Sequence, residues 1–280
     1  MIFDFLFRKF SRKTQDMTFL EHVDVLRSYL IRAILAIFLF SILAFFFKNI
    51  VFDIIILGPK TPDFITYKVL CKIAALTDFK SLCIDVLPFK LINIDLAGQF
   101  RYHLVISIIS GIILAAPYIF YQLWLFVKPA LTDKELGYAK GMVFYISSLF
   151  FTGVLFGYFI IVPLTVNFLA TYELSAQIEN TITIGSYISI VAVLSLSMGL
   201  VFELPVLIYF LSRIGILTPV FLRKYRKHAV VVILILAGFI TPSTDMFSQI
   251  LVAMPLYILY EISIHISKRV VRKKSAQVVE

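Results

Sequence analysis

Two carboxylates lie where a charged side chain needs a partner, and Glu203 is the more unusual of them. It interrupts an apolar run at residues 200–205, directly before Leu204 and Pro205. A carboxylate inside the hydrocarbon region of a bilayer costs several kcal/mol and is usually functional or paired. On the residues alone, Glu203 either faces a polar cavity or a partner, or it contacts a neighbouring helix.

Glu135 is the second carboxylate, and it follows an aromatic-rich stretch that includes Trp124 and Phe126. A carboxylate in a loop can hold an arginine ligand through two parallel hydrogen bonds. Most loop carboxylates are simply hydrated, so binding and solvation both remain open for Glu135.

The remaining reactive side chains do not form an enzyme site. The four histidines are dispersed along the chain without the close spacing of a metal site, and glycine-rich phosphate loops are absent. We therefore predict a protein that is not an enzyme and uses no cofactor. Work against a gradient would then draw on the membrane potential or on partner proteins.

The elements that must position these residues are membrane helices. Hydrophobic residues make up 60% of the chain and charged residues 15%, whereas a soluble domain has roughly 45–50% and about 25%. The net charge of +9 does not indicate nucleic-acid binding, because basic residues beside membrane helices mainly fix orientation. Charged residues separate six apolar segments, at about residues 30–47, 104–127, 141–169, 184–211, 229–240 and 246–264.

These segments predict an all-α membrane protein with six transmembrane helices in a single integral membrane domain, residues 1–280. Four of the helices contain a proline, namely Pro117, Pro163, Pro205 and Pro255. Each proline removes a backbone hydrogen bond and favours a kink. A kinked, concave bundle is therefore expected.

Helices five and six are predicted to be short. The apolar residues between His228 and Thr241 span roughly 18 Å, against a hydrocarbon core about 30 Å thick. The charge-free part of helix six, residues 246–260, is short as well. A short pair would thin the bilayer or lean on longer partners, and a misread boundary is the alternative explanation.

The distribution of basic residues predicts that both termini are cytoplasmic. The cytoplasmic side would hold 19 of the 26 Lys and Arg residues, in the N-terminal segment 1–29 and the first turn after it, two loops and the tail 265–280. The other seven lie in an outer loop or cap, residues 48–103, together with five aspartates. This asymmetry follows the positive-inside rule.

The outer cap is predicted to form short amphipathic helices against the membrane surface, because apolar residues are scattered through it. These are Phe64, Ile65, Val69, Leu70, Ile73 and Leu76. Both cysteines of the chain, Cys71 and Cys83, also lie here. They either form a disulfide in an oxidising compartment or remain two unpaired core residues.

Three groups of residues occur in the order typical of one known family: Tyr121-Gln122-x-Trp124-x-Phe126-x-x-Pro129-Ala130-Leu131 with Glu135; Phe202-Glu203-Leu204-Pro205 with Gly215-Ile216-Leu217-Thr218-Pro219; and Thr241-Pro242 with Ser248-Gln249 and Pro255-Leu256-x-x-x-Tyr260-Glu261. They resemble the first cytoplasmic loop and the fourth to sixth helices of the TatC family. This family is the signal-receptor subunit of the twin-arginine (Sec-independent) protein translocase. The resemblance covers about residues 19–267.

A further family pattern, His-x-x-Glu-Leu-Arg, precedes the first helix, and here residues 22–27 read His-Val-Asp-Val-Leu-Arg. The histidine, Leu26 and Arg27 agree with it, but Val25 stands where the family has glutamate. The family uses carboxylates from this segment and the next loop to hold paired arginines. Asp24 or Glu21 is therefore the candidate substitute.

The resemblance implies a receptor for the twin-arginine signal peptides of folded precursor proteins in the bacterial cytoplasmic (inner) membrane. Its signal-peptide site would consist of Glu135, Phe126, Arg27, Leu26, Asp24 and Glu21. Single-span TatA/TatB-type subunits would join it in an oligomeric complex driven by the protonmotive force. Glu203 would lie within the concavity, and Thr241 and Gln249 would offer hydrogen bonds to partner helices.

Two other functions compete with this one. A proton-coupled secondary transporter of a small solute would use the kinked helices and Glu203 as its site. Internal two-fold repetition would favour that alternative, and the pattern of segment lengths shows none. A structural scaffold without peptide specificity is the second competitor.

Overall fold

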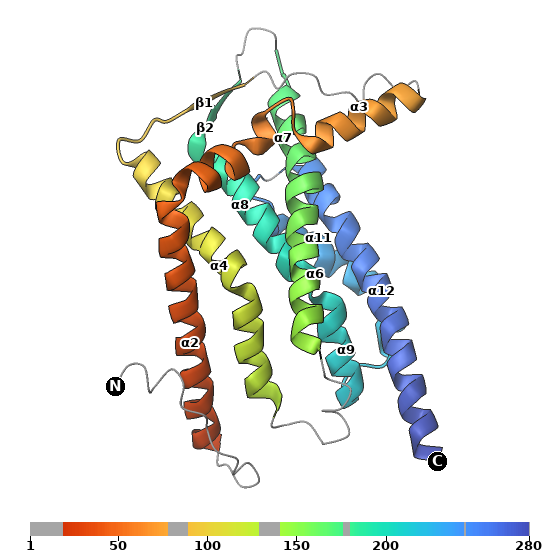
Figure 1. Cartoon of the computed structure of the whole chain (residues 1–280). Helices are drawn as coiled ribbons and strands as arrows, with labels where there is room; N and C mark the ends of the chain where they lie inside the picture. Colours follow the sequence, from red (N-terminus) through yellow and green to blue (C-terminus); the bar gives the residue numbers. More distant parts are fainter. Residues whose placement is uncertain (1–18, 78–88, 129–140, 176–179, 244, 280) are drawn as a thin grey trace, which may run out of the picture. The chain divides into compact units, whose positions relative to one another are not determined.

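Helices form most of the chain in the computed structural model, which describes residues 19–77, 89–128, 141–175, 180–243 and 245–279 (Figure 1). The chain divides into two compact units: unit 1 holds residues 1–47 and 107–148, and unit 2 holds residues 48–106 and 149–280. Within the described residues, five helical segments are long and apolar enough to cross a membrane: Val23–Phe46, Gly98–Val127, Met142–Thr171, Ile184–Ile214 and Met246–Arg272. The predicted multi-spanning helical architecture is confirmed.

Unit 1 is built on α2 (Phe19–Phe46) and the C-terminal part of α4 (Gly98–Val127), which lie side by side (Figure 1). A Cβ atom on Gly111 would lie 2.1 Å from Ser41 Oγ and 2.7 Å from the Ser41 backbone nitrogen. Small residues let membrane helices approach this closely. Gly111 therefore fixes the spacing between the two helices.

The first helix is longer than predicted. α2 begins at Phe19 and not near Leu30, so the segment from His22 to Arg27 is helical. Hydropathy marks where a helix enters lipid, but it does not mark where the helix begins, because charged side chains such as Arg and Glu are good helix formers.

Unit 2 contains the largest buried core, in which Tyr187, Leu194 and Met198 of α8 are almost fully buried. The chain runs through α6 (Met142–Phe156), the π-helix η5 (Gly157–Ile161) and α7 (Val162–Thr171), and then through α8 (Ile184–Val201) and α9 (Leu204–Ile214). The π-helix directly precedes Pro163, and the break between α8 and α9 directly precedes Pro205. Irregular helix at these two prolines agrees with the predicted kinks, whereas Pro117 and Pro255 lie inside uninterrupted helices.

The last three helices of unit 2 are α10 (Pro219–Lys224), α11 (Arg226–Ile240) and α12 (Met246–Val279). α11 has 15 residues, about 22 Å, so the predicted short fifth helix is confirmed. The sixth helix was predicted to end near Ile264, and this is wrong because α12 has 34 residues. Glu261 and the basic residues after it end the apolar segment without ending the helix.

The segment predicted to form the outer cap contains η1 (Asn49–Ile56), η2 (Gly58–Lys60), α3 (Ile65–Thr77) and strand β1 (Lys90–Ile92). β1 pairs in parallel with β2 (Thr181–Thr183), so that Lys90 lies opposite Thr181. The amphipathic helix predicted in the cap is confirmed as α3. The two strands are a small addition to the predicted helical fold; three-residue strands are too short to show an alternating pattern, and their pairing depends on segments distant in sequence.

Cys71 of α3 is disulfide-bonded. The other cysteine of the chain, Cys83, lies outside the described residues. Of the two alternatives that the sequence left open, the disulfide therefore holds for Cys71.

Candidate functional site

Unit 1 brings two segments of the predicted peptide site to the same end of its helix pair. Arg27 lies 14 residues before Ser41 in α2, and Phe126 lies 15 residues after Gly111 in α4. Each separation corresponds to about 21–23 Å along a helix. Because Ser41 and Gly111 are in contact and the helices run in opposite directions (Figure 1), Arg27 and Phe126 lie at the same height.

The side chains at this end differ in exposure. Asp24 and Arg27 are exposed, Leu26 is 37% exposed, and Phe126 is half-buried. Asp24 and Arg27 are three residues apart in α2, which puts them on neighbouring positions of one helix face. An acidic, a basic and an apolar side chain are thus available to a ligand from α2.

Two carboxylates of the predicted site cannot be placed in this geometry. Glu135 lies outside the described residues. The backbone of Glu21 belongs to the first turns of α2, about one helical turn before Val25, while its side chain is not among the described ones. Val25 itself is half-buried.

Gln122 belongs to the same aromatic-rich pattern as Phe126, and its environment in the structure makes it a further candidate residue for the peptide site. It lies one turn before Phe126 in α4, and only 4% of it is exposed. Its side-chain oxygen is buried and has no hydrogen-bond partner among the described residues. A buried amide oxygen without a donor is costly, and an amide inside an otherwise apolar stretch was the sequence signal for it.

Glu203 lies at the junction of α8 and α9 in unit 2. It is the residue before α9, where its backbone carbonyl accepts a hydrogen bond from Leu207 and Pro205 occupies the first turn. The proline lacks the N–H that would continue the helix. The Oε1 atom of Glu203 is buried without a hydrogen-bond partner in the described part of the chain.

Thr241 and Gln249 lie together on the α11–α12 pair. The buried Thr241 hydroxyl donates to the Ala237 carbonyl at 3.0 Å, and the Gln249 amide nitrogen donates to the Leu234 carbonyl at 2.8 Å. A Cβ on Gly238 would come within 3.2 Å of that amide nitrogen. Both polar groups are therefore used within the chain, and Gln249 keeps its side-chain oxygen for another donor.

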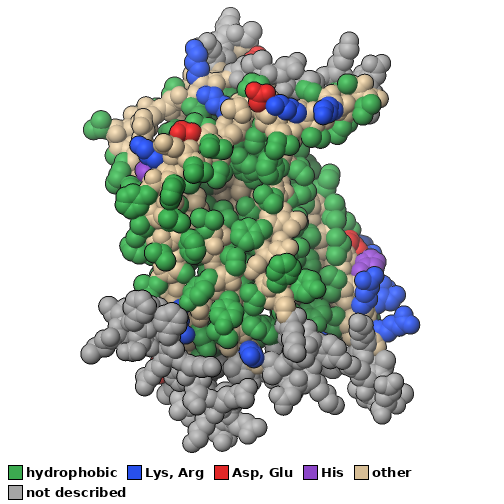
Figure 2. Space-filling model, viewed as in Figure 1, with side chains coloured by type: hydrophobic (Ala, Val, Ile, Leu, Met, Phe, Trp, Pro, Cys, Tyr) green, Lys and Arg blue, Asp and Glu red, His purple; other side chains and the backbone are tan. Residues whose placement is uncertain are grey.

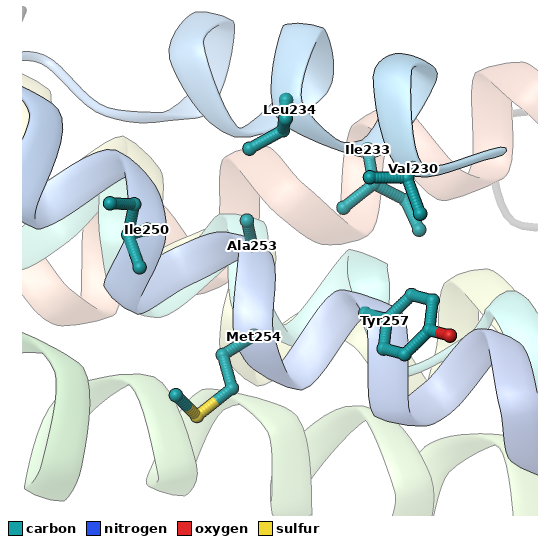
Figure 3. Close-up of a pocket in the computed structure, with 7 residues that line it drawn as sticks. All are labelled: Val230, Ile233, Leu234, Ile250, Ala253, Met254 and Tyr257. Carbon is teal, nitrogen blue, oxygen red and sulfur yellow. The ribbon is translucent and has the colours of Figure 1, made fainter. Parts of the chain in front are cut away.

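An apolar groove of about 270 Å³ runs between α11 and α12 (Figure 3). Its lining comes from both helices and consists of Val230, Ile233, Leu234, Ile250, Ala253, Met254 and Tyr257. The groove could not be predicted from the sequence, because it depends on how two separate helices pack.

An ion pair closes one end of the same helix pair. Arg226, the first residue of α11, bonds to Glu261 of α12 with 2.6 Å between Nη2 and Oε2. The Tyr257 hydroxyl lies 3.3 Å from the other oxygen of Glu261. Glu261 of α12 is thus paired with the residue that begins the short helix α11.

The opposite end of the pair is held by Asp245. Its Oδ1 accepts a hydrogen bond from the Ser248 backbone N–H at 2.7 Å and thereby caps α12. Burial raises the pKa of Asp245, but neighbouring donors, first of all the Ser248 backbone N–H, outweigh it and lower the pKa below its ordinary value. An aspartate directly before the apolar segment that starts at Met246 is the sequence feature that could have predicted this cap.

Relatives of known sequence resemble the chain over most of its length. A family model described as Sec-independent protein translocase protein (TatC) matches residues 21–255. The TatC protein of Blattabacterium sp. subsp. Periplaneta americana (strain BPLAN) is 41% identical over 261 residues, covering 92% of this chain and 98% of that protein. The TatC protein of Aquifex aeolicus (strain VF5) is 34% identical over 259 residues, again covering 92% and 98%.

Solved structures agree with this similarity. A crystal structure of the twin arginine translocase receptor TatC in DDM aligns with a TM-score of 0.72 and 31% identity, covering 88% of this chain and 99% of that one. These matches favour a translocase over the small-solute transporter. The chain belongs to the TatC family of Sec-independent protein translocase proteins.

Proposed function

We propose that this chain binds twin-arginine signal peptides at the end of unit 1 and forms the core of a translocase that exports folded proteins. The observation that carries the proposal is that Arg27 of α2 and Phe126 of α4 lie at the same end of this helix pair. These are positions of the family patterns, and crystal structures of the twin arginine translocase receptor TatC resemble the chain.

The chemistry of the ligand suits carboxylates at this end. Two neighbouring guanidinium groups bind best to two carboxylates, and the planar arginine fork discriminates against lysine. Glu135 supplies one carboxylate in this proposal. Glu21 supplies the other, because it precedes Val25 by one turn of α2 and so replaces the glutamate that the family has there.

We also propose six membrane crossings, with both termini in the cytoplasm of a bacterium and the chain in its inner membrane. The five long helices and the short α11 make up the six. The charge asymmetry of the loops supports this orientation.

Partner subunits would join at unit 2. TatA/TatB-type single-span helices would use the Gln249 side-chain oxygen and the apolar groove, since interhelical hydrogen bonds in lipid contribute roughly 0.6–2 kcal/mol each. Glu203 would serve the transport step as a polar position within the membrane, in a complex driven by the protonmotive force.

Crosslinking tests the receptor function. A photoreactive group in the 128–140 loop should label a twin-arginine precursor, and a precursor with twin lysines should not be labelled. Glu135→Ala should abolish labelling while the protein still inserts into the membrane, because removing one partner of a charged pair costs about 2–5 kcal/mol. Equal labelling of both precursors, or unchanged labelling in Glu135→Ala, would refute the assignment.

A further inference from the structure

The first turns of α3 are fixed to neighbouring elements of unit 2. The Thr66 hydroxyl donates to the Phe159 carbonyl of η5, and the Tyr67 hydroxyl donates to the Pro59 carbonyl at 2.7 Å. The ring of Phe64 stacks on Phe159 with 5.5 Å between centroids. The orientation of α3 relative to η5 and η2 is therefore set by specific contacts.

One face of α3 is apolar and exposed. Ile65, Val69, Ile73 and Leu76 are 62%, 48%, 43% and 87% exposed, and their spacing places them on a single stripe of the helix. The opposite face is buried, with Tyr67 and Ala74 only 1% and 4% exposed. Exposed apolar stripes of this kind mark an interaction surface.

The depth of the α3 contact matches a membrane surface. Phe159 lies about 17 residues beyond Met142, where the membrane-crossing helix begins, which is roughly 26 Å along the helix. The hydrocarbon core is about 30 Å thick, so α3 meets this helix close to the level where lipid tails end. In Figure 1, α3 starts beside the helix that contains η5 and α7 and extends sideways away from it.

Lysines lie beside the apolar stripe. Lys68 and Lys72 are exposed on the neighbouring helix positions, and Lys68 is paired with Asp63 at 3.0 Å. Figure 2 shows basic and acidic side chains along the α3 arm. Long basic side chains with their stems on an apolar surface suit the headgroup region, where phosphates are available.

We propose that α3 is an interfacial helix that inserts this stripe into the outer leaflet of the bilayer, with Lys68 and Lys72 at the lipid phosphates. A stripe of four side chains is small beside the roughly 800 Å² per partner that a stable protein interface buries. Lipid therefore fits this surface better than a second copy of the chain does. The assignment of α3 to the outer leaflet rests on the orientation proposed above, but its insertion into lipid does not.

Photocrosslinking from single positions tests the insertion. Benzoylphenylalanine replaces Leu76 in the full chain, which is reconstituted into vesicles of phosphatidylethanolamine and phosphatidylglycerol. The matched control replaces Ala75, an exposed neighbour that lies about 100° around the helix from Leu76. We expect at least about fivefold more lipid adducts from position 76 than from position 75.

A second pair of probes guards against misfolding. Ile65 lies at the other end of the stripe, and exposed Asp63 just before the helix is its control. Formation of the Cys71 disulfide checks that each variant has folded. Equal lipid labelling within both pairs, or adducts from position 76 to a second copy or another protein in place of lipid, would overturn the proposal.

Discussion

The polar groups of the two units are presented in opposite ways. At the end of unit 1, Asp24 and Arg27 are exposed on the first turns of α2. In unit 2, Thr241 and Gln249 donate hydrogen bonds to carbonyls of α11, and Glu203 has a buried oxygen with no donor in the described part of the chain. The difference separates an exposed charged surface, which suits a charged, hydrated peptide, from polar groups enclosed between apolar helices.

The solvent explains this division. Exposed charges lose little hydration free energy on folding and remain available to a ligand. A carboxylate among lipid-facing helices loses its hydration, which destabilises it unless it is paired. Binding and transport should therefore fail separately when each unit is altered.

Gly111→Ala should have the largest effect. The new methyl group would overlap Ser41 Oγ and the Ser41 backbone, so α2 and α4 must separate at a cost of about 3 kcal/mol or more. We expect loss of detectable precursor crosslinking. The control is Gly153→Ala, whose Cβ would meet Met198 and Phe202 of unit 2 at 2.6–2.8 Å. Crosslinking that survives Gly111→Ala but is lost in Gly153→Ala would contradict the assignment of precursor binding to unit 1.

Glu21→Gln should weaken precursor binding next most strongly. Losing one of two carboxylates from an arginine site lowers affinity by roughly tenfold to a hundredfold. Asp24→Asn, on the adjacent turn, should change affinity by less than about threefold. Titration of labelled signal peptide against both variants measures the two affinities. A larger loss of affinity in Asp24→Asn than in Glu21→Gln would assign the second carboxylate to Asp24 instead.

Glu203→Leu should leave binding intact while transport falls. Replacing a buried oxygen that lacks a donor by an apolar side chain should leave the thermal stability in detergent unchanged or raise it by about 1 kcal/mol. Peptide affinity should stay within about twofold of the original. Export assays measure the expected loss of transport, and unfolding curves measure the stability. Full export activity in this variant would show that Glu203 has no part in the transport step.

Asp245→Asn should have the smallest effect, visible only in its pH dependence. A carboxyl whose pKa is lowered on folding stabilises the protein above its ordinary pKa of about 3.9, and this stability is lost as the pH falls through the folded value. Asn still caps the helix, so the difference at pH 7 should be below about 1 kcal/mol. The melting temperatures of the original protein and of the variant, measured between pH 3 and 7, should converge at low pH. A constant difference over this range would exclude a contribution from titration of Asp245.

The sequence by itself determined the membrane class, the order of the helices and the family. Long apolar runs bounded by charges leave few alternatives to lipid as the solvent, and the short fifth helix followed from counting residues between His228 and Thr241. The polar residues of the family patterns, such as Glu203 and Gln249, could also be selected in advance because each is costly in an apolar segment.

Only the tertiary structure decided what those residues contact. The Arg226–Glu261 pair, the bond from Gln249 to Leu234, and the pairing of β1 with β2 join segments that are distant along the chain. Hydropathy also misplaced the ends of α2 and α12, because helices continue through charged residues once they leave the lipid. Solvent preference is a property of each segment alone, whereas contacts depend on which segments meet.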